Sequence, residues 1–221
     1  MISSVDRRSE YVENRAGANV TLNNFLTPYT LDNKSSILNA PCGYSNGVYA
    51  SLRPVGGENL LLHSDWDDVG TGVAPTGWGT FDPNFQAGAE TGQIRFIISV
   101  NRGYIYQDIS LSVGVYSFSF YCDSVTTACQ LSNVVAVYGS ATRATIGYFK
   151  NGVSANSSDS IEAGNRYTFV FNVTGAGTGR FRIGAGVNSN DTADITLSRL
   201  QLEKGYRATP YIETTTSPAT N

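Results

Sequence analysis

Residues 115–122, VYSFSFYC, and residues 166–174, RYTFVFNVT, decide the fold of this chain. In both stretches aromatic or aliphatic side chains alternate with polar ones, and this period of two residues is typical of a β-strand with one buried face. The first stretch turns Tyr116, Phe118, Phe120 and Cys122 to the same side. We therefore expect two strands whose aromatic side chains lie in a core.

The alternation continues outward from these two stretches. Residues 93–100, 104–111, 133–139, 144–150 and 179–187 repeat it, and turn signals such as Asn151-Gly152 separate them. In residues 179–187, Arg180 and Arg182 are expected to face water. No stretch shows a long period of 3.6 residues, so the pattern predicts an all-β protein, an antiparallel jelly-roll β-sandwich.

The last strand of the pattern contains an irregularity. Ile195 and Leu197 have one parity, whereas Leu200 and Leu202 have the other. A β-bulge near Ser198–Arg199 would return all four side chains to the core.

Composition narrows the possible functions. Only 15% of residues are charged, the net charge is −3, and no cluster of Lys or Arg is present. Nucleic acid is therefore an unexpected partner, because phosphate binding requires a concentrated basic surface. The longest apolar runs, such as residues 96–100, are far shorter than the roughly 20 residues of a membrane-spanning helix, so no membrane partner is expected.

The chain is expected to have three parts: residues 1–57, an N-terminal arm or small subdomain used in assembly; residues 58–204, the jelly-roll sandwich; and residues 205–221, a C-terminal tail. The tail, KGYRATPYIETTTSPATN from residue 204, has few charges and little to bury. Either it is disordered, or it is ordered by docking on a neighbouring molecule, and we favour docking. The polar N-terminus has no secretory signal, and the odd number of cysteines is typical of a reducing cytoplasm.

The order of the motifs provides a resemblance. The segment ENLLLHSDWDD (residues 58–68), followed by APTGWGTF (residues 74–81), resembles the opening of jelly-roll carbohydrate-binding modules associated with xylanases. The end, ITLSRLQLEKGYRATPYIETT (residues 195–215), is similar to a closing strand and tail of tailed-phage structural proteins, in which this module occurs. The resemblance covers about residues 58–216.

The resemblance implies candidate ligand sites. Some sugar-binding members hold calcium with acidic residues near the first strand and an Asp on the last strand. Asp65 and Asp67 could supply the first part, but this chain has Ser198 and Arg199 on its last strand, so calcium is a doubtful cofactor and no other is expected. Flat aromatic rings stack on sugars, and the predicted carbohydrate-binding residues are Trp78, Tyr104 and Tyr106.

Residue types that favour catalysis are scarce. The single histidine, His63, is expected within the first strand, and no Gly-x-Ser-x-Gly elbow accompanies it. The acidic residues lie mostly in or beside turns, where Asp is common for structural reasons. We therefore expect no enzyme, no catalytic residue and no metal site beyond the calcium candidates.

Together these features predict a non-enzymatic structural protein of a tailed-phage virion, made in the bacterial cytoplasm. We expect it on the particle exterior, as a head-decoration (cement) protein or a short head or tail appendage. Its expected partners are copies of itself in a homotrimer and the major capsid or tail proteins. The alternative is a carbohydrate-binding tail-fibre module that recognises host surface glycans; a secreted microbial sugar-binding module is a third interpretation, weakened by the missing signal peptide.

Overall fold

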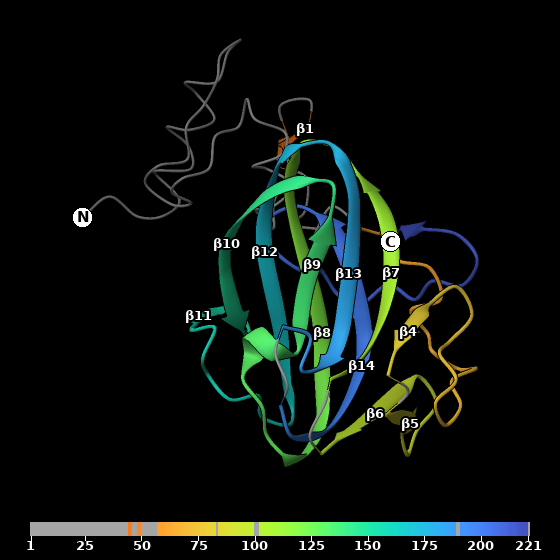
Figure 1. The fold of residues 1–221 in the computed structure, drawn as a ribbon. Coiled ribbons are helices and arrows are strands. Elements are labelled where there is room, and N and C mark those ends of the chain that lie inside the picture. The colour runs from red at the N-terminus through yellow and green to blue at the C-terminus, as the bar shows by residue number, and fades with distance from the viewer. Residues whose placement is uncertain are drawn as a thin grey trace. The chain divides into compact units, whose positions relative to one another are not determined.

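Two antiparallel β-sheets packed face to face form the body of the protein in a computed structural model (Figure 1). The structure describes residues 44–45, 48–49, 57–82, 84–99, 102–188 and 191–220. The chain divides after residue 56, and the account below concerns the part from residue 57 onward. Of the predicted arm, residues 1–57, only β1 (Tyr44–Ser45) and β2 (Val48–Tyr49), which pair with each other, and residue 57 lie inside the described residues.

The larger sheet has seven strands in the order β11-β10-β12-β8-β14-β6-β5. All of its pairings are antiparallel. Its strands in chain order are β5 (Phe85–Ala87), β6 (Gln93–Ile98), β8 (Gly114–Thr127), β10 (Thr142–Lys150), β11 (Val153–Ala155), β12 (Asn165–Gly175) and β14 (Ala193–Lys204).

The smaller sheet has four strands in the order β4-β7-β13-β9, and in Figure 1 β7, β9 and β13 lie in front of β8, β12 and β14. Its pairings are also antiparallel. A third pair joins the two ends of the described body, β3 with β15. The remaining elements are β3 (Glu58–Asn59), β4 (Gly79–Phe81), β7 (Gly103–Leu111), β9 (Val135–Gly139), β13 (Gly177–Ala185), β15 (Ala219–Thr220) and the 3-10 turn η1 (Leu131–Asn133).

The core lies between the two sheets and is rich in aromatic rings. Phe118 and Phe171 of the larger sheet both contact Phe181 of the smaller one, with ring centroids 5.3 Å and 6.0 Å apart. All three side chains are fully buried. The all-β antiparallel sandwich predicted from the alternating pattern is thus confirmed.

The predicted bulge in the last strand is confirmed as well. The register between β14 and β8 shifts between Ser198 and Gln201, and Arg199 has a φ of 55°. As a result the side chains on either side of the bulge all reach the core with no exposed area: Ile195, Leu197, Leu200 and Leu202.

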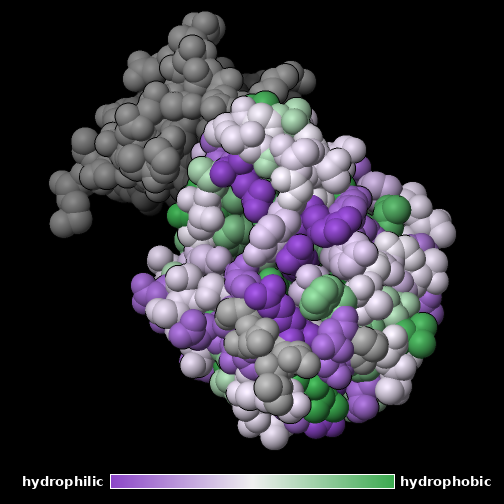
Figure 2. Space-filling view, in the orientation of Figure 1, coloured by the Kyte–Doolittle hydropathy of each residue, from purple (hydrophilic) through white to green (hydrophobic). Residues whose placement is uncertain are grey.

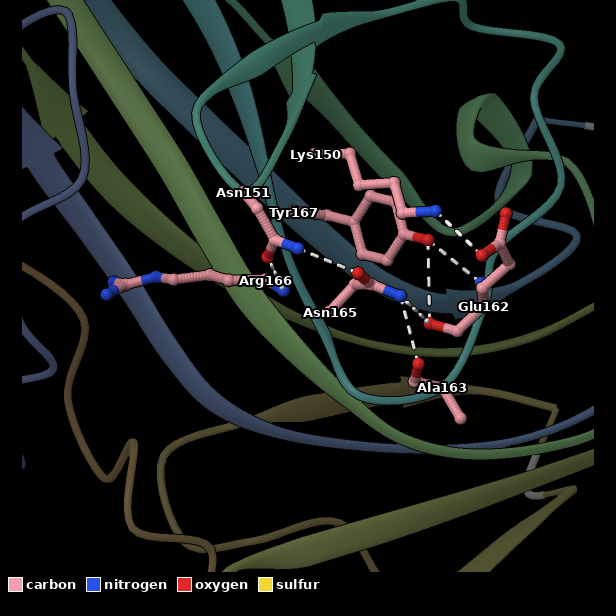
Figure 3. A network of polar contacts seen from close by, with 7 residues as sticks. All are labelled: Lys150, Asn151, Glu162, Ala163, Asn165, Arg166 and Tyr167. Atoms are coloured by element: carbon pink, nitrogen blue, oxygen red, sulfur yellow. Dashed lines mark hydrogen bonds and ion pairs between the residues drawn. The ribbon is translucent and has the colours of Figure 1, made fainter.

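A polar network fixes the turn between β10 and β11 and the start of β12 (Figure 3). Asn151 adopts the left-handed conformation, with a φ of 50°, as a tight hairpin turn requires. Its side chain donates to Asn165 Oδ1 at 2.8 Å and accepts from the Arg166 amide at 2.9 Å. Nearby, the Tyr167 hydroxyl accepts from the Glu162 amide at 2.8 Å. These contacts hold an edge hairpin whose side chains are largely exposed.

The C-terminal segment corrects one expectation. We expected residues 205–221 to have little to bury and to become ordered on a neighbouring molecule, but residues 209–215 pack on their own domain. Ile212 and Thr214 are 6% and 1% exposed. The amides of His63 and Ser64 donate to the carbonyls of Thr215 and Thr214 at 2.7 Å and 3.0 Å. The segment is part of the folded body because it completes the polar contacts of the domain's first strand region.

A buried amide connects the first strand to this segment. The Asn59 side chain is fully buried and donates to Ile212 O at 2.8 Å and to Leu200 O at 3.1 Å. Its Oδ1 accepts from the amides of Leu61 and Leu202 at 3.2 Å and 3.0 Å. One side chain therefore satisfies backbone groups from three parts of the chain.

Residues 209–214 cover part of the outer side of the larger sheet. Arg166 donates to Thr209 O at 2.6 Å and to Ser119 Oγ at 2.9 Å. Glu203, which is 2% exposed, accepts from the Thr209 amide at 2.9 Å. Gln201 accepts from the Ile212 amide at 2.7 Å. We call this the covered face; its strand residues are Ser119, Arg166, Gln201 and Glu203.

Candidate functional site

The outer side of the smaller sheet carries a row of aromatic and charged side chains. On β7 and β13, the residues that alternate with the core positions point away from the core, and strand pairing aligns them. Tyr104 pairs with Gly184, Tyr106 with Arg182 and Asp108 with Arg180. We call this surface the Tyr–Arg face; its residues are Phe81, Tyr104, Tyr106, Asp108, Tyr138, Arg180 and Arg182.

One half of the Tyr–Arg face is a stack of three rings and one guanidinium. Phe81 and Tyr104 lie parallel, with centroids 5.0 Å apart and an interplanar angle of 7°. The Arg182 guanidinium lies 4.9 Å from the Tyr104 centroid and 3.9 Å from that of Tyr138. Cation–π contacts of this kind are favourable and hold the arginine in one orientation. The Tyr138 hydroxyl donates to Asn188 Oδ1 at 2.6 Å, which fixes the end of the stack.

The other half is an arginine held between a ring and a carboxylate. The Arg180 guanidinium lies 4.4 Å from the centroid of Tyr106. It also donates to both carboxylate oxygens of Asp108, at 2.8 Å and 2.7 Å. These hydrogen bonds hold the pKa of Asp108 below its usual value and raise that of Arg180. Gly79 lies under Tyr106, because a Cβ there would be 2.4 Å from the ring.

The Tyr–Arg face is accessible to another molecule. Phe81 is 50% exposed and Tyr138 is 37% exposed. The side chains of Arg180 and Asp108 are 41% and 42% exposed. Figure 2, seen from the same side as Figure 1, shows strongly hydrophilic residues across the middle of the molecule, where β7, β9 and β13 lie. The surface combines fixed charges with flat rings, which suits recognition of a polar partner.

The predicted sugar-binding residues separate into two groups. Tyr104 and Tyr106 are both on the Tyr–Arg face, although Tyr104 is only 5% exposed because Phe81 and Arg182 cover its ring. Trp78 lies elsewhere. It is 7% exposed, meets Trp66 edge to face at 5.9 Å, and donates from Nε1 to Leu62 O at 3.0 Å. Trp78 thus closes one part of the core, and its ring is not open to a ligand in this arrangement.

The calcium candidates Asp65 and Asp67 lie in a loop near β14 of the larger sheet. Asp65 and Asp67 line a pocket together with Ser198 and Arg199. Burial raises the pKa of Asp65, and the charge of Asp67 adds to this effect. In the described part of the chain, no three Asp, Glu, His or Cys side chains are grouped so as to hold a metal ion.

His63 also lies outside any strand, contrary to the sequence-based expectation. It occupies a turn with a φ of 48°. Its amide bonds to the C-terminal segment, so it serves the packing described above. Cys122 is fully buried, as predicted, and Cys122 and Cys129 are free thiols whose pKa values burial raises to about 12.

Sequence reasoning missed the members of the Tyr–Arg face that lie on β9 and β13. The alternating pattern correctly predicted that Arg180 and Arg182 point away from the core, but it did not indicate that they lie beside Tyr106 and Tyr138. The missing information was the strand order, since β7, β13 and β9 are neighbours in space and not in sequence. Tyr138, the most exposed of the three tyrosines of this face, was not indicated by any pattern in the sequence.

Comparisons with known proteins add no family. The sequence matches no known protein-family model and no curated protein. Among the described residues, no helix is long and apolar enough to cross a membrane.

Proposed function

We propose that this chain is a non-enzymatic structural protein of a tailed-phage virion, present on the particle exterior as a head-decoration (cement) protein or a short head or tail appendage. The motif order of residues 58–216 supports the class of protein. The Tyr–Arg face supports the mode of action, because tyrosine and arginine are enriched among the residues that dominate binding at protein interfaces. The proposed partners are a major capsid or tail protein and copies of this chain in a homotrimer.

The single observation that carries this proposal is the pre-organisation of the Tyr–Arg face. Arg182 is held between two rings, and Arg180 is held by one ring and one carboxylate. Arginine and tyrosine side chains that are already ordered lose less conformational entropy when a partner binds. A fixed array of this kind favours a defined docking surface. Residues 1–57 remain a proposed assembly arm, whereas residues 209–215 have a role inside their own domain.

Co-sedimentation with particles tests this proposal. Arg180→Ala combined with Arg182→Ala should raise the protein concentration needed for half occupancy of purified particles at least about tenfold, since truncating a central arginine at an interface costs about 1.4 kcal/mol or more. The matched control is Arg95→Ala. Arg95 makes a similar bidentate pair with Asp194, at 2.7 Å and 2.6 Å, but on the larger sheet. Full occupancy of the double variant, or equal loss with the control, contradicts docking through this face.

Glycan binding is the second candidate, and the exposed rings of Phe81 and Tyr138 favour it. Aromatic faces at the surface can stack on sugar rings, and the neighbouring arginines and Asp108 can hydrogen-bond to hydroxyl groups. In this case Phe81→Ala and Tyr106→Ala should remove binding on a glycan array while the melting temperature changes little. Trp78→Ala should instead lower the melting temperature, because this ring is buried. Binding that survives Phe81→Ala and Tyr106→Ala would argue against this candidate.

A further inference from the structure

A second site lies on the larger sheet, beside the covered face. Five separate segments surround a pocket of about 380 Å³: the turn after the first strand region, the turn leading into β6, β8 at Asp123, the bulge of β14 and the C-terminal segment. Its lining is strongly acidic, with one arginine, Arg199, among the carboxylates. The acidic residues that line it are Asp65, Asp67, Glu90, Asp123 and Glu213.

Several polar groups of this acidic pocket have no partner within the described structure. Ser198 is 5% exposed, yet its Oγ makes no hydrogen bond of ordinary geometry. Asp65 Oδ1 and Asp123 Oδ2 are likewise buried oxygen atoms that make no hydrogen bond of ordinary geometry. Burial raises the pKa of Asp123. The Ser198 and Gln93 side chains approach its carboxylate closely enough to lower that pKa in part, but not with the geometry of an ordinary hydrogen bond. Buried polar groups are normally paired, so this concentration of unpaired oxygen atoms indicates a missing partner.

The arginine of the pocket does not supply that partner. The bulge gives Arg199 its left-handed backbone conformation, and its guanidinium lies 5.0 Å from the centroid of Tyr121. In the part of the chain that the structure describes, Arg199 makes no ion pair with the five carboxylates. The pocket therefore retains an excess of negative charge on its walls.

We propose that this pocket binds an arginine side chain of a partner polypeptide. The unpaired atoms are two carboxylate oxygens and one hydroxyl oxygen, all able to accept hydrogen bonds. A guanidinium offers five N–H donors in a planar fork and no acceptor, which matches such a lining. The carboxylates come from separate segments around a space of side-chain size, whereas a calcium ion requires oxygen atoms that converge at 2.3–2.6 Å on one point.

This site is independent of the Tyr–Arg face. Asp123 and Ser198 are on β8 and β14 of the larger sheet, and the Tyr–Arg face belongs to the smaller one. A virion protein could use both surfaces, but the arginine site needs no assumption about particles. Its failure would leave the proposed function standing, and the reverse is also true.

Titration of the full-length chain with an arginine peptide, followed by NMR, tests the proposal. The probe is acetyl-Gly-Arg-Gly-amide, and the matched probe replaces arginine with citrulline, which has nearly the same shape and no charge. We expect saturable shifts at Asp65, Asp123 and Ser198 with the arginine peptide only. Asp123→Asn and Asp65→Asn should each weaken binding about tenfold or more.

The control variant is Asp82→Asn, which removes the same charge outside the pocket. Asp82 has a φ of 54°, a conformation that asparagine also tolerates, so this change should leave both fold and binding unaffected. A thermal melt of each variant shows whether it is folded. Absence of shifts at 20 mM peptide, equal binding of the citrulline peptide, or equal weakening by Asp82→Asn overturns the proposal. Calcium that binds these residues when the arginine peptide does not would also overturn it and identify a metal site.

Discussion

The two outer sides of the sandwich use arginine in different ways. On the covered face, Arg166 lies beneath the C-terminal segment and bonds to Thr209 O and Ser119 Oγ. On the Tyr–Arg face, Arg180 and Arg182 contact tyrosine rings of their own sheet. Within the described residues, neither guanidinium contacts the C-terminal segment. Arg166 stabilises the domain and is covered by the C-terminal segment. Arg180 is partly exposed on the outer side of its sheet and can contact a partner. The difference predicts where a substitution affects stability and where it affects binding.

Among the substitutions considered, Asn59→Ala should lower the free energy of unfolding most, because Asn59 connects the first strand to the C-terminal segment. Asn59→Ala removes hydrogen bonds from backbone groups near Leu61, Leu200, Leu202 and Ile212, and those groups stay buried. We expect a loss of about 3 kcal/mol in the free energy of unfolding, since several buried groups become unpaired. Urea denaturation measures it. The control, Asn156→Ala, affects an exposed turn and should cost less than about 1 kcal/mol. Equal losses would show that the C-terminal segment is not an integral part of the domain.

Loss of the covered arginine should have the next largest effect. Arg166→Ala leaves Thr209 O and Ser119 Oγ without this donor and removes a positive charge that interacts favourably with buried Glu203. Two acceptors lose a charged donor and Glu203 loses a favourable charge interaction, so we expect a loss of about 2 kcal/mol in the free energy of unfolding. Lys150→Ala, which breaks an exposed ion pair with Glu162, should change the free energy of unfolding very little. A loss for Arg166→Ala as small as that for Lys150→Ala would remove the distinction between covered and exposed charge.

The smallest effect concerns acid pH and compares the matched Arg–Asp pairs on the two sheets. Hydrogen bonds from Arg180 and Arg95 lower the pKa values of Asp108 and Asp194 in the folded state. Their contribution is therefore present above the unfolded pKa, near 3.8, and is lost as the pH falls through the still lower folded values. Both pairs are partly exposed, so each should contribute only slightly to the free energy of unfolding.

Stability measured between pH 5 and pH 2 checks this expectation. Asp108→Asn and Asp194→Asn should each flatten the acid limb of the stability curve slightly and equally. A much larger change for Asp108→Asn would mean that the Tyr–Arg face stabilises the fold, contrary to the comparison above.

Much of the sandwich could be predicted from the sequence because strand burial has a local signature. The alternation around Phe118 and Phe171 and the change of parity after Leu197 depend on nearest neighbours along the chain, and both were predicted correctly. The position of residues 205–221 could not be predicted this way. Ile212 and Thr214 are buried by groups near Asn59, at the other end of the domain. The local sequence of residues 205–221 does not indicate that these residues pack against the region of Asn59.

The candidate sites show the same limit. Tyr104 and Tyr106 were found because they share a strand, but Arg182 and Tyr138 join them only through the strand order β7-β13-β9. The acidic pocket was harder to predict from the sequence, since five segments that are distant along the chain supply its walls. Asp65 was noticed for a possible calcium site, and Asp123 was not noticed, although the two face the same space.

Amide hydrogen exchange of the isolated, full-length protein tests the central claim most directly. The account predicts slow exchange for the amides of Ser64, Ile212 and Thr214, at rates close to those of core strands such as β8, because the C-terminal segment is bound to its own domain. Fast exchange at these three amides in the isolated protein, with protection gained only on addition of particles, would contradict the account. It would mean that the covered face is formed by assembly and not by the fold.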